Sequence, residues 1–539
     1  FSCIGYVVTH LFHSTLWMII RKWFSFINLN MNTSLKIAVA VVLTLCSACI
    51  GLTAQVQPNV LIILADDVGF GDIPANYSHA MVPMPNIQYL ADNGLRFLDA
   101  HSTSSVCAPT RYSLLSGNYP WRGRRPYGTW NYNGGTQFKK GQLTLAQILM
   151  GAGYHTAMFG KVHTGAHVYP RDPSAGFDES WHPPLDTIDL SKPLVGGPRD
   201  LGFNYSFTTP AGIQDNPYAY FENDLMIGEQ ESLVDWKAGE YPNDNGVSKI
   251  SPKHDGFGVP SWESNNYAID MVNKAIAFLD RHVAENKASG NEKPFFMHFC
   301  TETAHIPHSP PINFFGTPVK GQFPSEHLDM LYELDLIVGK LLTEIEAHGL
   351  LENTLVIFAS DNGGLSYSDH LGHDASGGYR GNKVSIYEGG HRIPMIMSWP
   401  MGGVLSGEVY PHLTGIQDLY KTLCDLLGVE VSAEQARDSI SFKPQLKGSM
   451  STPHRVTLMT QTIKGKGDLS YRHEAWKLIL KRDGQPHEFY NLEQDPFETN
   501  DLMGNPEFSA KIQQMHRDFL KLNPKGLIHL DSKNTKKKK

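Results

Sequence analysis

The sequence predicts an α/β protein: a large, mostly parallel central sheet flanked by helices, followed by a smaller C-terminal subdomain of antiparallel strands and a helix. Short apolar, β-branched runs alternate with helical patterns, which is typical of a parallel sheet. After residue 450 the pattern changes to closely spaced strands. The length of 539 residues fits one large α/β domain with a smaller one, and 41% hydrophobic with 19% charged residues is typical of a globular enzyme.

Three buried strands and three helices are predicted in the larger part. The strands cover residues 60–65, 295–300 and 355–359, and the helices cover residues 265–286, 329–348 and 414–427. Residues 170–260 are rich in Pro, Gly, Asp and Asn, and we expect long loops inserted around a site rather than a separate domain. In the C-terminal part, residues 455–460, 475–480 and 487–491 predict short antiparallel strands, and residues 507–522 predict a closing helix.

The first 54 residues are interpreted as targeting sequence. Residues 1–30 contain a ragged apolar stretch and no Met at their start, and we expect an upstream translation artefact. Residues 31–54 resemble a secretory signal peptide with cleavage near Ala54, which predicts an exported protein, periplasmic or secreted. The alternatives are a membrane anchor, for which residues 7–20 are short, and a lipid anchor at Cys46 or Cys49 without a good preceding pattern. The mature chain is expected to have no stable membrane span.

Charge and cysteine content exclude some classes of protein. The chain has 46 basic and 54 acidic residues and a net charge of −8, which does not favour nucleic-acid binding. Only Cys107, Cys300 and Cys424 follow the predicted signal peptide, so no disulfide framework is expected and the last two are predicted to be buried thiols. The expected domains are therefore residues 55–450 and 451–530, with 531–539 as a solvated basic tail.

A short helix is predicted to begin at Cys107. Pro109 suits the first turn, and Gly117 suits the C-cap. Cys107 and Arg111 are four residues apart and lie on one helix face. The free N–H groups and the guanidinium would attract an anion, and the same field is expected to lower the pKa of the thiol. The alternative is a small buried cysteine near a helix cap.

Two acidic pairs follow predicted strands directly. Residues 60–65 run into Asp66 and Asp67, and residues 355–359 run through one serine into Asp361 and Asn362. Ligands bind beyond the carboxyl ends of strands in open α/β sheets. Three carboxylates and an amide oxygen would form an oxygen-only cage suited to calcium or magnesium. Each aspartate taken alone is better explained as a helix cap or a turn, whereas two acidic pairs that both follow apolar strands are less easily explained in that way.

These motifs resemble those of one family. The run Cys107-Ala108-Pro109-Thr110-Arg111, extended through Leu114, Leu115 and Gly117, resembles the C-x-P-x-R signature of the formylglycine-dependent sulfatases, in the alkaline-phosphatase superfamily. The resemblance implies that Cys107 is converted to formylglycine (3-oxoalanine) by a formylglycine-generating or anaerobic sulfatase-maturing enzyme. This chain has Thr110 where serine is most frequent in the family, and Ser116 where threonine is usual.

The resemblance also implies a metal site and basic groups. Residues 66–72 and 360–364 resemble the family's metal motifs, which implies that Asp66, Asp67, Asp361, Asn362 and modified Cys107 hold one ion, usually Ca²⁺ rather than Mg²⁺. Residues 153–163 resemble the second signature, with Val162 in place of the usual tryptophan. There Lys161 would bind the sulfate or the formylglycine oxygen and His163 would orient the hydrated aldehyde, the two alternating outward if the strand continues.

Two more segments complete the implied catalytic set. His305 in His305-Ile306-Pro307-His308 would be a general acid for the leaving group, and Lys383, before Tyr387-Glu388-Gly389-Gly390, would bridge sulfate and leaving group. Arg111 completes the basic residues. The run from Glu488 to Thr499 resembles the family's C-terminal subdomain.

The substrate is less closely specified. His308, Asp215 and Arg125 are candidate substrate contacts; Asp215 lies in a run that resembles a loop near the pocket of many bacterial sulfatases. Trp130 and Tyr132 follow the signature helix and either stack on sugars or belong to an ordinary packed loop. We expect a sulfated carbohydrate, by analogy an algal polymer such as ulvan or carrageenan. The alternatives are a phosphonate monoester or phosphodiester hydrolase of the same fold, and a non-catalytic protein that binds sulfated glycans.

Overall fold

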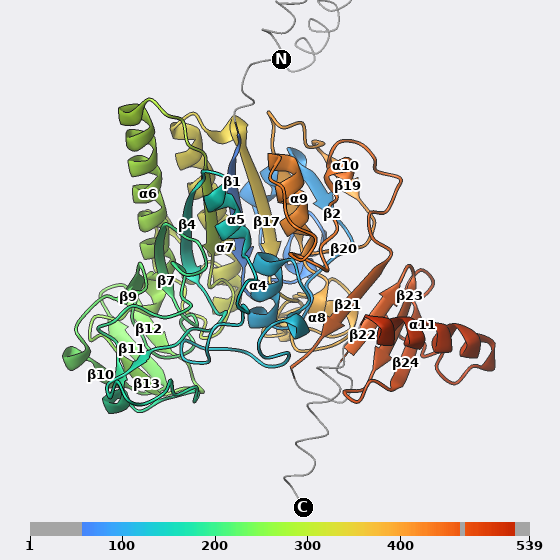
Figure 1. Ribbon diagram of the computed structural model, residues 1–539, viewed down its shortest axis with the longest axis horizontal. Coiled ribbons are helices and arrows are strands. Elements are labelled where there is room, and N and C mark those ends of the chain that lie inside the picture. The colour runs from blue at the N-terminus through green and yellow to red at the C-terminus, as the bar shows by residue number, and fades with distance from the viewer. Residues whose placement is uncertain (1–56, 464–468, 523–539) are drawn as a thin grey trace, which may run out of the picture. The chain divides into compact units, whose positions relative to one another are not determined.

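Figure 1 shows the computed structural model, which describes residues 57–463 and 469–522. The predicted artefact, the signal peptide and the basic tail lie outside the described residues. The described part is built on one ten-stranded sheet and a separate four-stranded sheet near the C-terminus, which confirms the predicted fold class. Among the described residues, no helix is both long and apolar enough to cross a membrane.

Five parallel strands form the middle of the large sheet. In spatial order they are β17 (Thr354–Ser360), β1 (Asn59–Ala65), β14 (Phe295–Cys300), β4 (His155–Lys161) and β7 (Tyr205–Thr209). Shorter strands extend the sheet, partly antiparallel: on the β17 side β18 (Met395–Ser398), β2 (Leu95–Phe97) and β19 (Glu408–Tyr410), and on the β7 side β8 (Phe221–Glu222) and β9 (Leu225–Met226).

Helices cover both faces of this sheet, as Figure 1 shows. Alternate residues of β1 enter two different apolar cores, because successive side chains of a strand point to opposite faces. Leu61 and Ile63 pack in the core with α3 (Pro85–Asp92), α6 (Tyr267–Ser289) and α7 (Glu326–Ala347). Val60 and Ile62 pack in the core with α4 (Cys107–Ser116), α5 (Leu145–Gly151) and α9 (Asp418–Leu427). A strand buried on both faces explains the continuous apolar runs in the sequence.

The strand register brings four strand ends to one edge. Ala65 of β1 lies opposite Ser360 of β17, and Leu64 lies opposite Cys300 of β14. Cys300 in turn lies opposite Gly160 of β4. The residues that follow β17, β1, β14 and β4 therefore emerge side by side, at the carboxyl edge where α/β proteins bind their ligands.

The structure corrects the prediction in two places. Residues 414–427 are not helical throughout: Thr414–Gly415 form strand β20, which pairs with β3 (Ala100–His101), and the helix begins at Asp418. Residues 170–260 are not loops alone, since they contain β7 of the central sheet. They also contain three two-stranded ribbons, namely β5 (Tyr169–Pro170) with β6 (Ile188–Asp189), β10 (Val234–Trp236) with β13 (Gly256–Gly258), and β11 (Gly239–Asn243) with β12 (Gly246–Ile250). The Pro, Gly, Asp and Asn residues mark turns between short strands.

The C-terminal subdomain is an antiparallel sheet packed against a helix. Its strands are β21 (Thr457–Gln461), β22 (Leu469–His473), β23 (Trp476–Leu480) and β24 (Pro486–Asn491), and its helix is α11 (Ser509–Lys521). The sequence missed β22, whose Ser470 and Arg472 interrupt the apolar pattern. Short elements elsewhere are α8 (Glu388–His391), α10 (Lys443–Leu446), β15 (Asn313–Phe314) and β16 (Thr317–Pro318).

Gly160 is a sensitive point of the sheet, since it directly precedes Lys161. Its φ is +87°, and a Cβ there would lie 1.8 Å from the carbonyl oxygen of Cys300. We predict that Gly160→Ala lowers the free energy of unfolding by about 1–3 kcal/mol, because the residue would be strained and the neighbouring backbone displaced. Urea unfolding measures the change.

Gly151→Ala is the control for this variant. Gly151 ends α5, and a Cβ there meets nothing within 4 Å. Alanine favours helix, so this substitution leaves stability unchanged or raises it. Equal losses in the two variants would contradict the role given to Gly160.

Candidate active site

Cys107 begins helix α4, as predicted, and Gly117 ends it with a left-handed φ of 64°. The Sγ atom of Cys107 lies 3.2 Å from Nδ1 of His163. The expected alternation of Lys161 and His163 along one strand is wrong, because β4 ends at Lys161. The backbone turns at His163, which has a φ of 51° and donates its N–H to the carbonyl of Pro210. This turn brings the imidazole to the sulfur.

The expected lowering of the thiol pKa is also wrong. Burial raises the pKa of Cys107 to about 11, although Lys161 and Lys383 act in the opposite direction. Burial also holds the pKa of His163 well below its usual range, with Lys161 acting in the same direction. The pair therefore consists of a protonated thiol and a neutral imidazole. An unmodified thiol in this setting is a poor nucleophile at neutral pH.

Arg111 connects three elements at the strand ends. Its side chain is 1% exposed. Its Nε and Nη2 atoms donate to Oδ2 of Asp361 at 2.9 and 2.7 Å, and its Nη1 donates to the carbonyl of Lys161 at 2.8 Å. Nη2 also lies 3.4 Å from Oδ2 of Asp66. The guanidinium thus fixes helix α4 to the ends of β1, β17 and β4.

Two lysines approach the acidic pair that follows β1. Nζ of Lys161 lies 2.5 Å from Oδ2 of Asp66, and Nζ of Lys383 lies 2.6 Å from Oδ1 of Asp67. Burial opposes ionisation of both acids. The charges of Lys161 and Arg111 nevertheless hold the pKa of Asp66 below its usual value. For Asp67, burial and the adjacent Asp66 outweigh Lys383, and the pKa is raised.

Four of the five predicted metal ligands form one buried cage. Asp66, Asp67, Asp361 and Asn362 are all 0% exposed, and Nδ2 of Asn362 donates to Oδ1 of Asp67 at 2.8 Å. Two oxygens, Oδ1 of Asp66 and Oδ1 of Asn362, have no hydrogen-bond partner although they are buried. Buried polar atoms normally have partners, so these two oxygens are suited to a cation. The donor set is hard oxygen, as calcium and magnesium require.

The cage also reaches the sulfur. The ligating atoms of Asp66, Cys107 and Asp361 lie within 4.8 Å of one another, and so do those of Asp66, Asp67 and His305. Nε2 of His305 is 3.6 Å from Oδ2 of Asp67, and its Nδ1 is 2.6 Å from the carbonyl of Ile306. Burial, with Lys161 and Lys383, holds the pKa of His305 well below its usual range. The structure therefore gathers every predicted catalytic and metal-binding residue.

A cavity of about 350 Å³ opens onto this group. Its walls include Cys107, His163, His305 and Lys383. Asp215 lines the same cavity, as the sequence predicts for a substrate contact. An oxygen cage, a cysteine and several basic groups in one cavity could hold an anionic ester next to a nucleophile.

Other predicted substrate contacts do not line this cavity. Arg125 forms an ion pair with Glu179. His308 is partly buried and stacks on His327, with 5.0 Å between ring centroids. Trp130 and Tyr132 are 1% and 0% exposed, so they cannot stack on a sugar, and the packed-loop alternative is correct for them.

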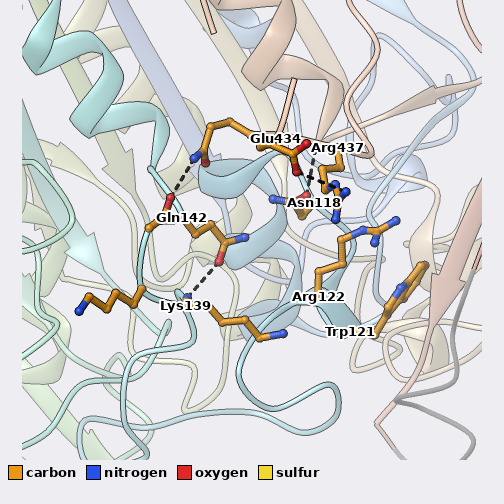
Figure 2. A pocket seen from close by; sticks show the side chains of 10 residues that line it. Asn118, Trp121, Arg122, Lys139, Gln142, Glu434 and Arg437 are labelled. Atoms are coloured by element: carbon orange, nitrogen blue, oxygen red, sulfur yellow. Dashed lines mark hydrogen bonds and ion pairs between the residues drawn. The ribbon is translucent and has the colours of Figure 1, made fainter. Parts of the chain in front are cut away.

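A separate cavity of about 470 Å³ lies beyond the C-terminal end of α4 (Figure 2). Arg122, Lys139, Lys140 and Arg437 make it rich in cations, but Arg122 is paired with Asp438, and Arg437 with Glu434. It contains none of the residues predicted for catalysis, metal binding or substrate binding. We therefore assign the candidate active site to the cavity that Cys107 lines.

Sequence reasoning missed Glu302, which follows β14. It is 3% exposed, and neither carboxylate oxygen has a partner of normal hydrogen-bond geometry. Burial raises its pKa to about 7; Lys161 and Arg111 lower it, and Asp66 raises it. The only available sequence signal was an acidic residue three positions before His305 at the end of a buried strand.

The fold and the grouping of basic and acidic side chains around Cys107 are those expected of a hydrolase of anionic esters. The family model described as Sulfatase matches residues 58–429, and the model described as N-sulphoglucosamine sulphohydrolase, C-terminal matches residues 379–525. The chain therefore belongs to the sulfatase family and is a sulfuric ester hydrolase. A divalent metal ion is typical of this family.

Individual relatives agree with this assignment. An N-acetylgalactosamine-6-O-sulfatase of Bacteroides thetaiotaomicron is 29% identical over 509 residues, which cover 85% of this chain and 92% of the relative. Arylsulfatase A of Bos taurus is 30% identical over 439 residues, covering 81% and 77%. A solved structure described under the metabolism of multiple glycosaminoglycans by Bacteroides thetaiotaomicron is 25% identical to this chain, with a TM-score of 0.71. The match covers 87% of this chain and 99% of that structure's chain.

Glu302 makes stability depend on pH. Its pKa is about 7 in the folded protein, against an ordinary value of 4.5, so the folded state binds the additional proton between these values. The contribution of this proton to the free energy of unfolding is therefore fully present below pH 4.5 and is lost as the pH rises toward 7. We predict that Glu302→Gln gains stability relative to wild type across this window, by at most about 1.4 kcal/mol per pH unit.

Urea unfolding at pH 5 and pH 8 tests this prediction. Glu434→Gln is the control, because the Glu434 side chain is 79% exposed and its substitution should give a small difference at both pH values. A Glu302→Gln difference that stays constant with pH, or shrinks as the pH rises, would show that the carboxyl is not held protonated.

Proposed function

We propose that this chain is a formylglycine-dependent sulfatase that uses a calcium ion to hydrolyse sulfate esters of carbohydrates. The observation that carries the proposal is the position of Cys107. Its sulfur faces the imidazole of His163 at 3.2 Å and lies against an oxygen cage with two unpartnered oxygens. Conversion to the aldehyde resolves the chemical difficulty that the raised thiol pKa creates.

A hydrated aldehyde at position 107 is a better catalyst than a thiol or a serine. A sulfated serine has no simple route to release sulfate, whereas a sulfated hydrate releases it when the carbonyl re-forms. One hydroxyl of the hydrate occupies the place of Sγ, within reach of His163. The neutral imidazole can take the proton of the remaining hydroxyl as sulfate departs.

The oxygen cage fits calcium. Asp66, Asp67, Asp361 and Asn362 would hold the ion together with modified Cys107, and magnesium is the less suitable alternative because it prefers to keep several waters. The bound ion would supply positive charge for the sulfate oxygens.

The chain's own residues supply the remaining steps. One hydroxyl of the hydrate attacks sulfur and passes its proton to Asp361, whose pKa burial raises to about 7. Arg111, Lys161 and Lys383 stabilise the charge on the sulfuryl oxygens. His305 donates a proton to the departing alcohol oxygen. Its pKa is low in the empty cavity, and the negative charge of a bound ester favours its protonation.

A carbohydrate ester is the proposed substrate. The relative from Bacteroides thetaiotaomicron is named for N-acetylgalactosamine 6-O-sulfate, and the cavity carries polar groups and exposed aromatic rings besides the catalytic ones. By analogy, an algal polymer such as ulvan or carrageenan is the proposed source of this ester. The rival phosphonate or phosphodiester activity is distinguished by assaying sulfate and phosphate esters side by side.

Export completes the proposal. Residues 31–54 would direct the chain to the periplasm or outside the cell, where calcium is available, with residues 55–450 as the catalytic domain and 451–530 as the subdomain. A formylglycine-generating or anaerobic sulfatase-maturing enzyme is the partner that this scheme requires.

Modification of Cys107 is the first prediction of this proposal. Mass spectrometry of the peptide that contains Cys107 should show the mass decrease that accompanies conversion of a thiol to an aldehyde. Cys107→Ala should abolish hydrolysis of 4-nitrophenyl sulfate, and Cys424→Ala, at another buried free cysteine, should leave the modification intact. Full activity in Cys107→Ala would contradict the proposed formylglycine mechanism.

Calcium binding is the second prediction. Calcium should raise the melting temperature of the wild-type protein, because a ligand that binds only the folded state contributes about 2.7 kcal/mol at a hundred times its Kd. Asp66→Asn should lose most of this shift. Asp438→Asn, which removes an acid that pairs with Arg122 outside the cage, should keep it. An undiminished shift in Asp66→Asn would place the ion elsewhere.

A further inference from the structure

A second group of side chains lines the cavity that holds Cys107. Three separate segments of residues 170–260 meet here and bring together Trp181, His182, Asp215 and His254. Ligating atoms of His182, Asp215 and His254 lie within 4.8 Å of one another. Trp181, Asp215 and His254 line the cavity directly, and the catalytic scheme uses none of the four.

Local contacts hold this group in place before any ligand arrives. Nδ1 of His182 is 2.8 Å from Oδ1 of Asn216 and 3.7 Å from Oδ1 of Asp215. The hydroxyl of Tyr218 donates to the carbonyl of His254 at 2.7 Å. Gly256 packs so closely that a Cβ there would lie 2.4 Å from Cβ of Asn216. Preorganised groups lose little entropy when a ligand binds.

The chemistry of the group suits a sugar ring. Asp215 is 4% exposed, and burial raises its pKa to about 7, while bonds from the Asn216 backbone and the Trp181 side chain act in the opposite direction. Such a poorly solvated carboxyl gains from hydroxyl donors that a ligand brings. The imidazoles both donate and accept, and the Trp181 ring is 40% exposed, which offers an apolar face.

We propose that Asp215, His182 and His254, beside the Trp181 ring, bind neighbouring hydroxyl groups of the sugar that carries the sulfate ester. The group determines specificity: it selects a carbohydrate sulfate over an aryl sulfate, which has no such hydroxyls. This inference rests on the proposed function, because the sugar must lie next to the nucleophile at position 107. The cavity volume of about 350 Å³ is at the lower end of the range for small-molecule sites, about 300–1,000 Å³.

Paired kinetics on two substrates test the inference. The sugar probes are N-acetylgalactosamine 6-sulfate and its C4 epimer, N-acetylglucosamine 6-sulfate. The aryl probe is 4-nitrophenyl sulfate. Asp215→Asn and His254→Gln should each lower kcat/KM for the better sugar about 10- to 100-fold, the effect of removing a hydrogen bond to a charged or buried group. The same variants should change kcat/KM for the aryl ester by less than about threefold, since they do not touch the reacting atoms.

Asp224→Asn is the matched control. Asp224 lies in the same insertion, is 1% exposed and has a pKa that burial raises to about 7, but it accepts from the backbone of Arg199 and does not line the cavity. It should leave the ratio of sugar to aryl activity unchanged. Equal losses on both substrates in Asp215→Asn, or a wild-type protein that hydrolyses the aryl ester and neither sugar, would overturn the inference.

Binding separates failure of this inference from failure of the proposed function. Calorimetry with N-acetylgalactosamine 6-sulfate uses Cys107→Ala protein, which cannot turn the sugar over. The double variant Cys107→Ala/Asp215→Asn should bind the sugar more weakly than Cys107→Ala alone, and the double variant Cys107→Ala/Asp224→Asn should not. This result supports the sugar-binding group even if Cys107 proves unmodified. Equal affinity in all three proteins overturns the inference even if the enzyme is an active sulfatase.

Discussion

The site depends on a balance of buried charges at the carboxyl edge of the sheet. Three aspartates, Asp66, Asp67 and Asp361, meet three basic side chains, Arg111, Lys161 and Lys383, and the acids are fully buried. Removing one member of such a cluster costs about 3–5 kcal/mol, because an unpaired charge stays behind. The six charges cancel formally, so a divalent cation in the cage would leave an excess of positive charge. That excess would suit the negative charge of the proposed sulfate ester.

Much of this arrangement could be predicted from the sequence. The strands that run into Asp66 and Asp361 are unbroken apolar runs, and parallel strands must meet at their carboxyl ends, so the cage follows from pattern and topology. The turn at His163 could not be predicted, because it depends on a hydrogen bond to Pro210 from another part of the chain. Nor could the raised thiol pKa, because a helix N-terminus lowers it and burial raises it, and only the structure shows that burial dominates. The group at Asp215 joins distant segments of an insertion without periodicity, and sequence spacing carries no information about such contacts.

The C-terminal subdomain helps to position the loop that carries Lys383. Lys477 of β23 is 1% exposed and pairs with Glu388 at 3.0 Å and with Glu498 at 2.8 Å. Glu388 follows Lys383 by five residues, and its backbone N–H donates to Glu498 at 2.6 Å. The subdomain therefore holds the segment that places Lys383 beside Asp67. The two matched family models overlap over residues 379–429, a stretch that begins with this loop.

The protonation states of the site follow from its burial. Desolvation favours the neutral form of every titratable group in the site. It raises the pKa of Cys107 to about 11 and that of Asp361 to about 7. It also holds the pKa values of His163 and His305 well below their usual range. In the proposed mechanism His163 accepts a proton when sulfate leaves, which suits a neutral imidazole. The same proposal gives His305 a proton to donate to the leaving group, and burial of the unliganded site disfavours that proton. A bound sulfate ester brings the negative charge that raises its pKa. Under this proposal, binding of the substrate itself promotes protonation of the general acid.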